Sequence, residues 1–262
     1  MEIVRVRFID TKNKGCENAP AAILHCFKEI NCKENGSLID KSKLRFEEIH
    51  VDLDNKEEAE YLILENAKEI FERNFKSFFI GGDSSMLVSL IRAFEQIEKD
   101  SFILVMDAHA GCQSSSSSSL SLLDRGWLKR LVEEKKRNIL LLGTRSYDLY
   151  EKEFLKQNRI ISIDMSLLRE DREGICELIM ERAHTASGFF IIIDLDVVDP
   201  AFAPGVNSIE PGGLASGELI YFMQRLQLLK NFKGAALIGV NPDKDINEMS
   251  VKLSAKLLAE MV

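Results

Sequence analysis

Cysteine, histidine and long apolar runs are scarce in this sequence of 262 residues, and each scarcity excludes a class of protein. The cysteines number five, an odd count with no Cys-x-x-Cys pair, so we expect neither a disulfide framework nor a zinc ribbon. Free cysteines fit a reducing compartment, and we therefore expect a cytoplasmic protein. No apolar run approaches the roughly 20 residues needed to span a bilayer, which argues against a membrane partner.

Positive charge is also in short supply. The chain has 34 lysines and arginines against 42 aspartates and glutamates, for a net charge of −8. A basic face is needed to bind the phosphates of nucleic acid, so we expect no nucleic-acid partner. Apolar residues make up 45% of the chain, which is enough for a large core. The serine run at residues 114–119 is the one low-complexity tract, and it predicts a surface loop.

Short apolar runs that end in polar or glycine residues alternate with segments of helical periodicity. Uniformly apolar strands alternating with helices indicate an α/β fold with three α/β/α layers around a mainly parallel sheet. No repeat or linker interrupts the pattern, so we assign residues 1–262 to a single domain. The predicted strands are residues 2–10, 77–83, 102–107, 138–145, 189–194 and 235–240, and the predicted helices are residues 57–74, 85–99, 174–183, 216–230 and 246–262.

Acidic side chains gather where these strands end, which is where parallel sheets bind ligands. Side chains alternate along a strand, so Asp107 and His109 are expected to point the same way, as are Asp194 and Asp196. Three carboxylates and one imidazole suit manganese, magnesium, iron(II) or zinc. The sequence therefore predicts a metal site at these four residues. The stretches concerned are FFIGGDSS (78–85), LVMDAHAGCQ (104–113) and IIIDLDVVDPAFAPGV (191–206).

Four blocks, in sequence order, resemble the signature blocks of the ureohydrolase family, which includes arginase and agmatinase. The resemblance covers most of the chain, and the third block is the most specific. It implies an arginase/deacetylase-like fold, a homo-oligomer (trimer or hexamer) and a site where two manganese ions bridge a hydroxide that attacks a guanidinium carbon. A guanidino-type small molecule is then the expected ligand, and hydrolysis of its C–N bond the expected reaction. The blocks are GGDSS, DAHAGC, DLDVVDPAFAPGVNSIEPGGL and GVNPDKD.

The chain departs from the family pattern at several positions, and each departure removes a side chain that the family uses for metal binding, substrate binding or proton transfer. The family's blocks read Gly-Gly-Asp-His and Asp-Ala-His-x-Asp, and the last position of each is here Ser84 and Gly111. The resemblance implies that both lost ligands serve one metal, while the four retained ligands complete the other. The family's substrate-binding glutamate corresponds to Gly239, and no histidine between residues 110 and 183 replaces the family's proton shuttle. We therefore expect one divalent metal, most simply manganese, and weak or absent activity.

Two further aspartates are expected to support the site without binding metal. Asp83 follows the glycine pair of the first block and orients its loop, and Asp199, followed by proline, forms a turn and accepts hydrogen bonds behind the ligands. Cys112 lies three residues after His109, but a lone cysteine is typically a small buried hydrophobe. Trp127 is expected to anchor a helix in the core.

Three functions stay open at this point. The first is an active ureohydrolase, which the third block favours and the lost ligands oppose. The second is a mononuclear metal hydrolase of unknown substrate, because a single ion can still activate water. The third is a non-catalytic paralogue that acts as a binding scaffold or forms a hetero-oligomer with an active relative, since fold stability does not depend on site chemistry.

Overall fold

One eight-stranded sheet runs through the molecule, and all of its neighbouring strands are parallel. The computed structural model describes residues 1–9, 14–113 and 126–262. The strand order is β2-β1-β3-β8-β7-β4-β5-β6, so β4 and β7 lie side by side within the sheet. The strands are β1 (Glu2–Ile9), β2 (Arg45–Asp52), β3 (Ser77–Ile80), β4 (Ser101–Met106), β5 (Ile139–Thr144), β6 (Ile161–Asp164), β7 (Gly188–Asp194) and β8 (Phe232–Ile238).

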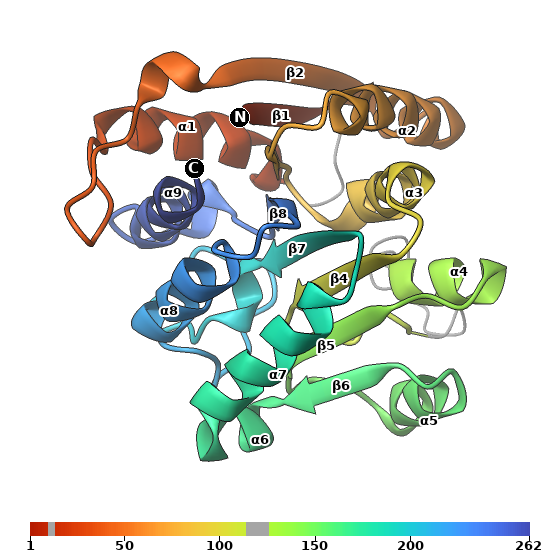
Figure 1. The fold of residues 1–262 in the computed structure, drawn as a ribbon. Helices are drawn as coiled ribbons and strands as arrows, with labels where there is room; N and C mark the ends of the chain where they lie inside the picture. Colours follow the sequence, from red (N-terminus) through yellow and green to blue (C-terminus); the bar gives the residue numbers. More distant parts are fainter. Residues whose placement is uncertain (10–13, 114–125) are drawn as a thin grey trace.

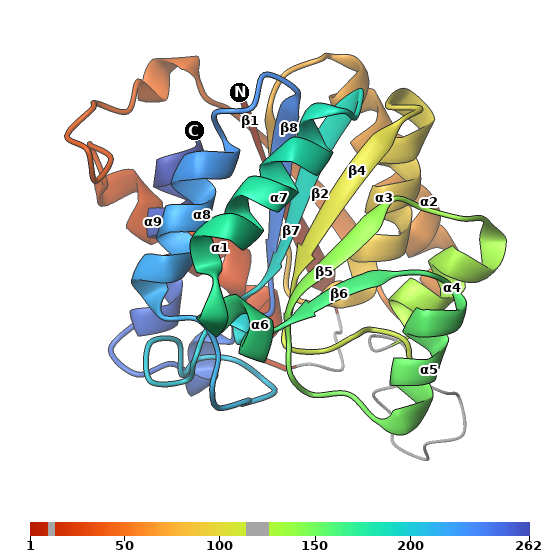
Figure 2. The same cartoon turned by 60° about the horizontal axis from the view of Figure 1, so that its bottom comes forward.

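Helices cover both faces of this sheet, which confirms the predicted three-layer α/β/α fold (Figures 1 and 2). The layer on one face contains α1, α6, α7, α8 and α9, and the layer on the other contains α2, α3, α4 and α5. The helices are α1 (Ala19–Glu29), α2 (Lys56–Glu72), α3 (Leu87–Ile97), α4 (Trp127–Glu134), α5 (Leu149–Gln157), α6 (Met165–Glu170), α7 (Arg172–His184), α8 (Ser216–Leu226) and α9 (Met249–Met261).

Alternation along the central strands divides the core in two. In β4, Phe102, Leu104 and Met106 belong to the cluster beneath the first helical layer. Ile103 and Val105 belong to the cluster beneath the second. Both faces of the central strands are therefore buried, which explains why these strands are apolar along most of their length. A large core on each side keeps the strand ends in fixed positions.

The predicted elements agree with the structure except at their ends and in a few short segments. The six predicted strands correspond to β1, β3, β4, β5, β7 and β8, and the five predicted helices to α2, α3, α7, α8 and α9. The strands β2 and β6 and the helices α1, α4, α5 and α6 have no counterpart among these predicted ranges. Asp10, at the end of the first predicted strand, and the serine run at 114–119 lie outside the described residues. The assignment of the whole chain to one domain stays a prediction.

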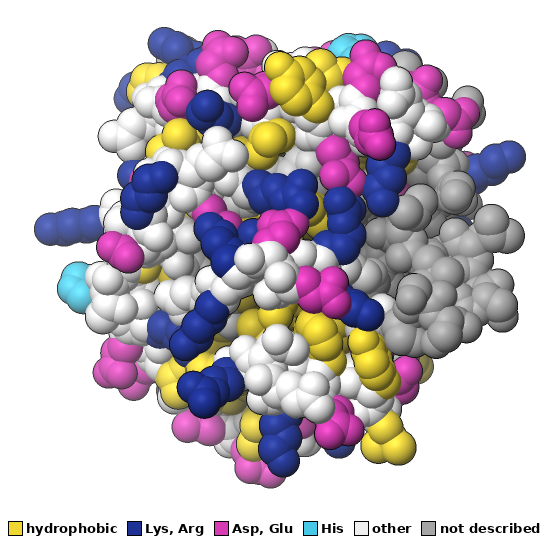
Figure 3. Space-filling view, turned by 90° about the vertical axis from the view of Figure 1, so that its right-hand side faces the viewer, with side chains coloured by type: hydrophobic (Ala, Val, Ile, Leu, Met, Phe, Trp, Pro, Cys, Tyr) yellow, Lys and Arg dark blue, Asp and Glu magenta, His cyan; other side chains and the backbone are white. Residues whose placement is uncertain are grey.

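Acidic and basic side chains are interspersed over the helical layer formed by α2 to α5 (Figure 3). Some form ion pairs between elements. Arg130 Nη2 on α4 lies 2.8 Å from Glu60 Oε2 on α2, and Arg137 Nε, in the segment after α4, lies 3.0 Å from Glu95 Oε1 on α3. No helix within the described residues is long and apolar enough to cross a membrane.

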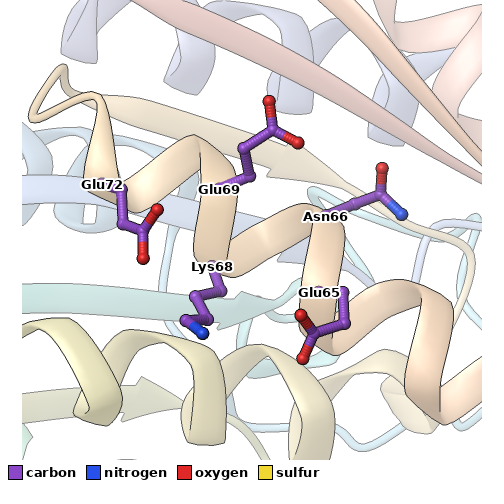
Figure 4. A pocket seen from close by; sticks show the side chains of 5 residues that line it. All are labelled: Glu65, Asn66, Lys68, Glu69 and Glu72. Atoms are coloured by element: carbon purple, nitrogen blue, oxygen red, sulfur yellow. The ribbon is translucent and has the colours of Figure 1, made fainter.

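A hollow on α2 is lined by the side chains of that helix alone (Figure 4). It contains none of the aspartates or histidines predicted from the strand ends. This hollow is therefore not part of the candidate site at the strand ends. The lining residues are Glu65, Asn66, Lys68, Glu69 and Glu72.

Candidate metal centre

Asp107, His109 and Asp196 form a buried group beyond the carboxyl ends of β4 and β7. One ligand atom from each residue lies within 4.8 Å of the other two. Nδ1 of His109 is 2.7 Å from Oδ2 of Asp196 and 3.6 Å from Oδ1 of Asp107. Two carboxylates and an imidazole around one point suit a divalent cation. The structure thus brings together three of the four predicted ligands.

These side chains are placed by loops beyond the strands. β4 ends one residue before Asp107, and Asp196 lies on the short 3-10 helix η4 (Leu195–Val197), so strand alternation does not govern their directions. Hydrogen bonds fix the directions of these side chains instead. The backbone N–H of His109 donates to Oδ1 of Asp107 at 2.6 Å. The N–H of Ala108 donates to Oδ1 of Asp196 at 3.0 Å, which ties the two loops together.

Asp194, the fourth predicted ligand, ends β7 and is not part of the group of three. Its Oδ1 accepts a hydrogen bond from the backbone N–H of Asp196 at 3.2 Å. The same carboxylate lies against Gly239: a Cβ built at Gly239 would overlap Oδ1 and lie 2.8 Å from Cγ of Asp194. Glycine at position 239 therefore leaves the space that this carboxylate fills.

Burial and mutual repulsion shift the pKa values of these groups. Burial raises the pKa of Asp107. Burial and the charge of Asp196 raise the pKa of Asp194 to about 8. Burial and the charge of Asp107 raise the pKa of Asp196 to about 6. For His109, burial lowers the pKa, but the bonds to Asp107 and Asp196 outweigh it and raise the pKa to about 11. Crowded, desolvated carboxylates of this kind are stabilised by a cation.

Gly111, where the resemblance predicts a lost metal ligand, lies against a tryptophan. Gly111 has a φ of 69°. The indole of Trp127, at the start of α4, lies so close that a Cβ at Gly111 would overlap Nε1 and lie 2.7 Å from Cε2. Trp127 is buried in the core as predicted. A ligand side chain at position 111 therefore requires the indole to move.

Ser84, the second position where the resemblance predicts a lost ligand, begins the short 3-10 helix η3 (Ser84–Met86). Asp83 caps this helix, because its Oδ1 accepts a hydrogen bond from the N–H of Ser85 at 3.0 Å. This bond is of the kind expected of a residue that orients its loop, as predicted for Asp83. A serine hydroxyl is a poor ligand for a divalent ion at neutral pH.

Two residues near the group were not singled out from the sequence. Oε1 of Glu210 lies 3.3 Å from Nε2 of His109. Nη2 of Arg145 donates to the backbone carbonyls of Asp196 at 2.6 Å and of Glu210 at 2.7 Å. A sequence signal existed for each. Glu210 is the only charged residue in the segment 200–213, and Arg145 directly follows an apolar strand.

Asp199 shapes the loop that carries Glu210. Its Oδ1 accepts from the N–H of Ala201 at 2.9 Å, and its Oδ2 accepts from the N–H groups of Gly212 at 2.6 Å and Gly213 at 3.3 Å. These backbone bonds hold the pKa of Asp199 below its usual value. Asp199 thus forms the expected turn, and its support of a bound metal stays a prediction.

Cys112 does not reach the group of three. Its thiol is buried and donates to the backbone carbonyl of Glu151 at 3.9 Å. Burial raises the pKa of this thiol to about 12. A neutral, buried thiol is the small hydrophobe expected from the sequence.

The sequence matches the profile of the Arginase family over residues 4–262. The chain belongs to the arginase family. This confirms the resemblance on which the ureohydrolase prediction was based. Divalent metals are typical of this family, and among the described residues the buried group of Asp107, His109 and Asp196 could hold one.

Curated relatives match over part of their length. Arginase 1, mitochondrial, of Oryza sativa subsp. indica is 29% identical over 215 residues, covering 76% of this chain and 58% of that protein. Formimidoylglutamase of Bacillus subtilis is 26% identical over 189 residues, covering 68% of this chain and 58% of that protein. This arginase-family chain thus spans less than two thirds of the length of these relatives.

Solved structures of similar proteins match the fold almost completely. The formimidoylglutamase of Bacillus subtilis superimposes with a TM-score of 0.89 at 21% identity, covering 99% of this chain and 86% of that one. The arginase of Bacillus subtilis gives a TM-score of 0.86 at 19% identity, covering 99% and 97%. An agmatine ureohydrolase of Thermoplasma volcanium gives 0.85 at 22% identity, covering 99% and 87%. At these identities the likeness confirms the arginase-like fold and nothing finer.

Proposed function

We propose that this arginase-family protein binds a single divalent cation, manganese, at Asp107, His109 and Asp196. The carboxylate of Asp194 is the fourth ligand in this proposal. Hydrolysis of guanidino C–N bonds is weak or absent, because the second metal position is lost. The observation that carries the proposal is the buried group of three, in which one ligand atom from each residue lies within 4.8 Å of the others.

The charge of these residues fits a cation. The carboxylates are buried, and crowding raises the pKa of Asp194 to about 8 and of Asp196 to about 6. Carboxylates that hold their protons this strongly repel one another when ionised, and a dication between them removes that repulsion. Oxygen ligands with one imidazole nitrogen suit manganese, whereas sites selective for softer ions use thiolates.

The chain's own residues bind and orient in this proposal. A bound divalent cation supplies Lewis-acid activation of water. His109, Asp107 and Asp196 hold that cation. Arg145 fixes the loop of Asp196 by donating to its backbone carbonyl at 2.6 Å. A site with one dication acidifies water less than a site with two, so the nucleophile at neutral pH is scarcer here.

The lost positions support low activity. The Trp127 indole fills the space beside Gly111, and a Cβ there would lie 2.7 Å from its Cε2. At Gly239, which corresponds to the family's substrate-binding glutamate, the Asp194 carboxylate occupies the space in which a side chain would begin. In this proposal the chain therefore lacks a side chain to bind the second ion at position 111 and a side chain to contact the guanidinium group at position 239.

A turnover assay tests this proposal. Purified protein with excess manganese is incubated with arginine, agmatine or formimidoylglutamate, the substrates that the names of the similar proteins indicate, and C–N cleavage is measured by product release. His109→Ala is the control, since it removes one ligand of the proposed site. We expect product release by the unsubstituted chain to equal or barely exceed that of the control. Saturable turnover at about 1 s⁻¹ or faster, which is ordinary for an enzyme, together with its loss in His109→Ala would overturn the claim of weak or absent activity.

The second candidate role is a non-catalytic scaffold that assembles with itself or with an active relative. It is favoured by the combination of a large two-sided core and a closed second metal position. We propose a homo-oligomer, trimeric or hexameric, or a hetero-oligomer with an active paralogue, in the cytoplasm. Native mass spectrometry tests the assembly, and a purely monomeric chain at micromolar concentration contradicts it.

A further inference from the structure

One ring nitrogen of His109 is buried without a hydrogen bond. No partner of Nε2 within the described residues meets hydrogen-bond geometry, although Oε1 of Glu210 is only 3.3 Å away. The His109 side chain is 11% exposed, so water has little access to this nitrogen. A buried N–H without a partner is costly, and a small rotation of a half-buried glutamate supplies the partner.

The two ring nitrogens of His109 face different surroundings. Nδ1 faces the candidate cation position, 2.7 Å from Asp196 Oδ2 and 3.6 Å from Asp107 Oδ1. Nε2 faces Glu210. A neutral imidazole carries one proton, and only the nitrogen without that proton can bind a metal. A histidine that binds metal through one nitrogen typically donates the other N–H to a carboxylate or carbonyl.

The backbone holds Glu210 at this position. Its carbonyl accepts from Nε of Arg145 at 3.2 Å and from Nη2 of Arg145 at 2.7 Å. Two residues further along, the N–H of Gly212 donates to Asp199 at 2.6 Å. The loop is therefore anchored at the glutamate itself and two residues beyond it. Such anchoring limits the positions from which the carboxylate can approach His109.

We propose that Glu210 is a positioning residue that accepts the Nε2–H of His109, so that the imidazole keeps its Nε2 proton and the divalent cation takes the place of the Nδ1 proton that bonds to Asp196. The proposal rests on the metal site put forward above. It assigns to Glu210 no contact with the metal or with a substrate. Glu210 acts through His109, by fixing which nitrogen carries the proton and how the ring is oriented.

Glutamate substitutions test this role in the full-length chain. Glu210→Ala removes the acceptor, and Glu210→Gln keeps an oxygen that accepts the same bond without the charge. Glu218→Gln is a matched control, because the Glu218 side chain is 35% exposed against 31% for Glu210 and Glu218 caps α8 through the N–H of Ala215. Affinity for Mn²⁺ is measured by calorimetry, and exchange of the His109 Nε2–H with water by NMR of the zinc-loaded protein.

We expect Glu210→Ala to weaken Mn²⁺ binding by about 10- to 100-fold and to speed exchange of the Nε2–H. Glu210→Gln should lose less affinity and keep the N–H protected, and Glu218→Gln should match the unsubstituted chain. Equal affinity in the unsubstituted chain and Glu210→Ala overturns this inference alone. Equal losses in Glu210→Ala and Glu210→Gln with unchanged N–H exchange also overturn it, since the glutamate then acts only on the loop. Failure of the unsubstituted chain to bind metal overturns both this inference and the proposed function.

Discussion

The indole of Trp127 packs directly against the backbone of Gly111. A Cβ at Gly111 would overlap Nε1 of the ring and lie 2.7 Å from Cε2. The glycine and the tryptophan therefore form one structural unit: a missing side chain admits the ring, and the ring excludes a replacement side chain. The resemblance implies that the family places a metal-binding aspartate at this position, and in the proposed single-metal site the ring takes the space of that side chain.

Restoring the aspartate should therefore destabilise the fold. We expect Gly111→Asp to lower the free energy of unfolding by about 1–3 kcal/mol, the usual cost of overpacking a core. Gly36→Asp is the matched control, because Gly36 has a similar φ of 83° and no atom lies within 4 Å of its Cβ position. Urea denaturation of both variants measures the difference. Equal costs at the two glycines would show that the Trp127 ring does not block position 111.

A bound cation should stabilise the protein. Free manganese at 100 times the dissociation constant adds about 2.7 kcal/mol to the free energy of unfolding. That corresponds to a rise in Tm of about 5–11 °C at about 2–4 °C per kcal/mol. Thermal unfolding with and without MnCl₂ measures it. His109→Ala should abolish the rise, and His50→Ala should keep it, since the His50 side chain is 53% exposed on the edge strand β2. The same rise in His109→Ala would place the cation elsewhere.

Arg145 should matter for metal affinity although it does not contact the candidate position. Its guanidinium donates to the backbone carbonyls of Asp196 at 2.6 Å and of Val197 at 3.2 Å. A lysine cannot reproduce this fork, so Arg145→Lys should weaken Mn²⁺ binding by about tenfold. The control is Arg182→Lys, because Arg182 bonds to the exposed side chain of Asn138. Calorimetric affinities that do not differ between the two variants would exclude the positioning effect of Arg145.

Glu260 should contribute a pH-dependent part of the stability. It is buried, and it accepts from the N–H of Glu34 at 2.7 Å and from Lys256 Nζ at 3.0 Å. Burial raises its pKa, but these bonds outweigh burial, and the pKa lies below its ordinary value of 4.5. A lowered carboxyl pKa adds stability above the unfolded-state value, and that stability is lost as the pH falls through the folded-state value.

Glu260→Gln should therefore lower the free energy of unfolding by about 1–3 kcal/mol at pH 7. The difference in free energy of unfolding between Glu260→Gln and the unsubstituted chain should become smaller as the pH falls below 4.5. Glu65→Gln on α2 is the control, because Glu65 is exposed and lines only the hollow shown in Figure 4. Denaturation curves between pH 3.5 and 7 measure both. A gap for Glu260→Gln that is independent of pH would contradict this account of its charge.

The fold was predictable because its main signal is local. Burial on both faces makes β4 apolar from Phe102 to Met106 and β7 apolar from Phe189 to Ile193, and apolar runs of that kind are visible in the sequence. The parallel pairing of these two strands then brings Asp107 and Asp196 to one edge. The edge strand β6 has only four residues and is partly exposed, so its apolar signal is too weak to distinguish from a loop.

The packing around the site was not predictable, because it depends on contacts between distant segments. Nothing in the sequence near Gly111 indicates that the ring of Trp127 returns to fill its side-chain space. The Asp194 carboxylate lies against Gly239 only because β7 and β8 are neighbours. The position of Glu210 beside His109 depends on a loop held by Arg145. The sequence places Arg145 directly after an apolar strand, but it does not show that the guanidinium donates to the backbone carbonyl of Glu210.

The number of manganese ions per chain tests the central claim most directly. Protein equilibrated with excess MnCl₂, freed of unbound metal and analysed by mass spectrometry for metal and protein content gives this number. The account predicts one ion per chain, and none in His109→Ala. Two ions per chain, with one retained in His109→Ala, would contradict it.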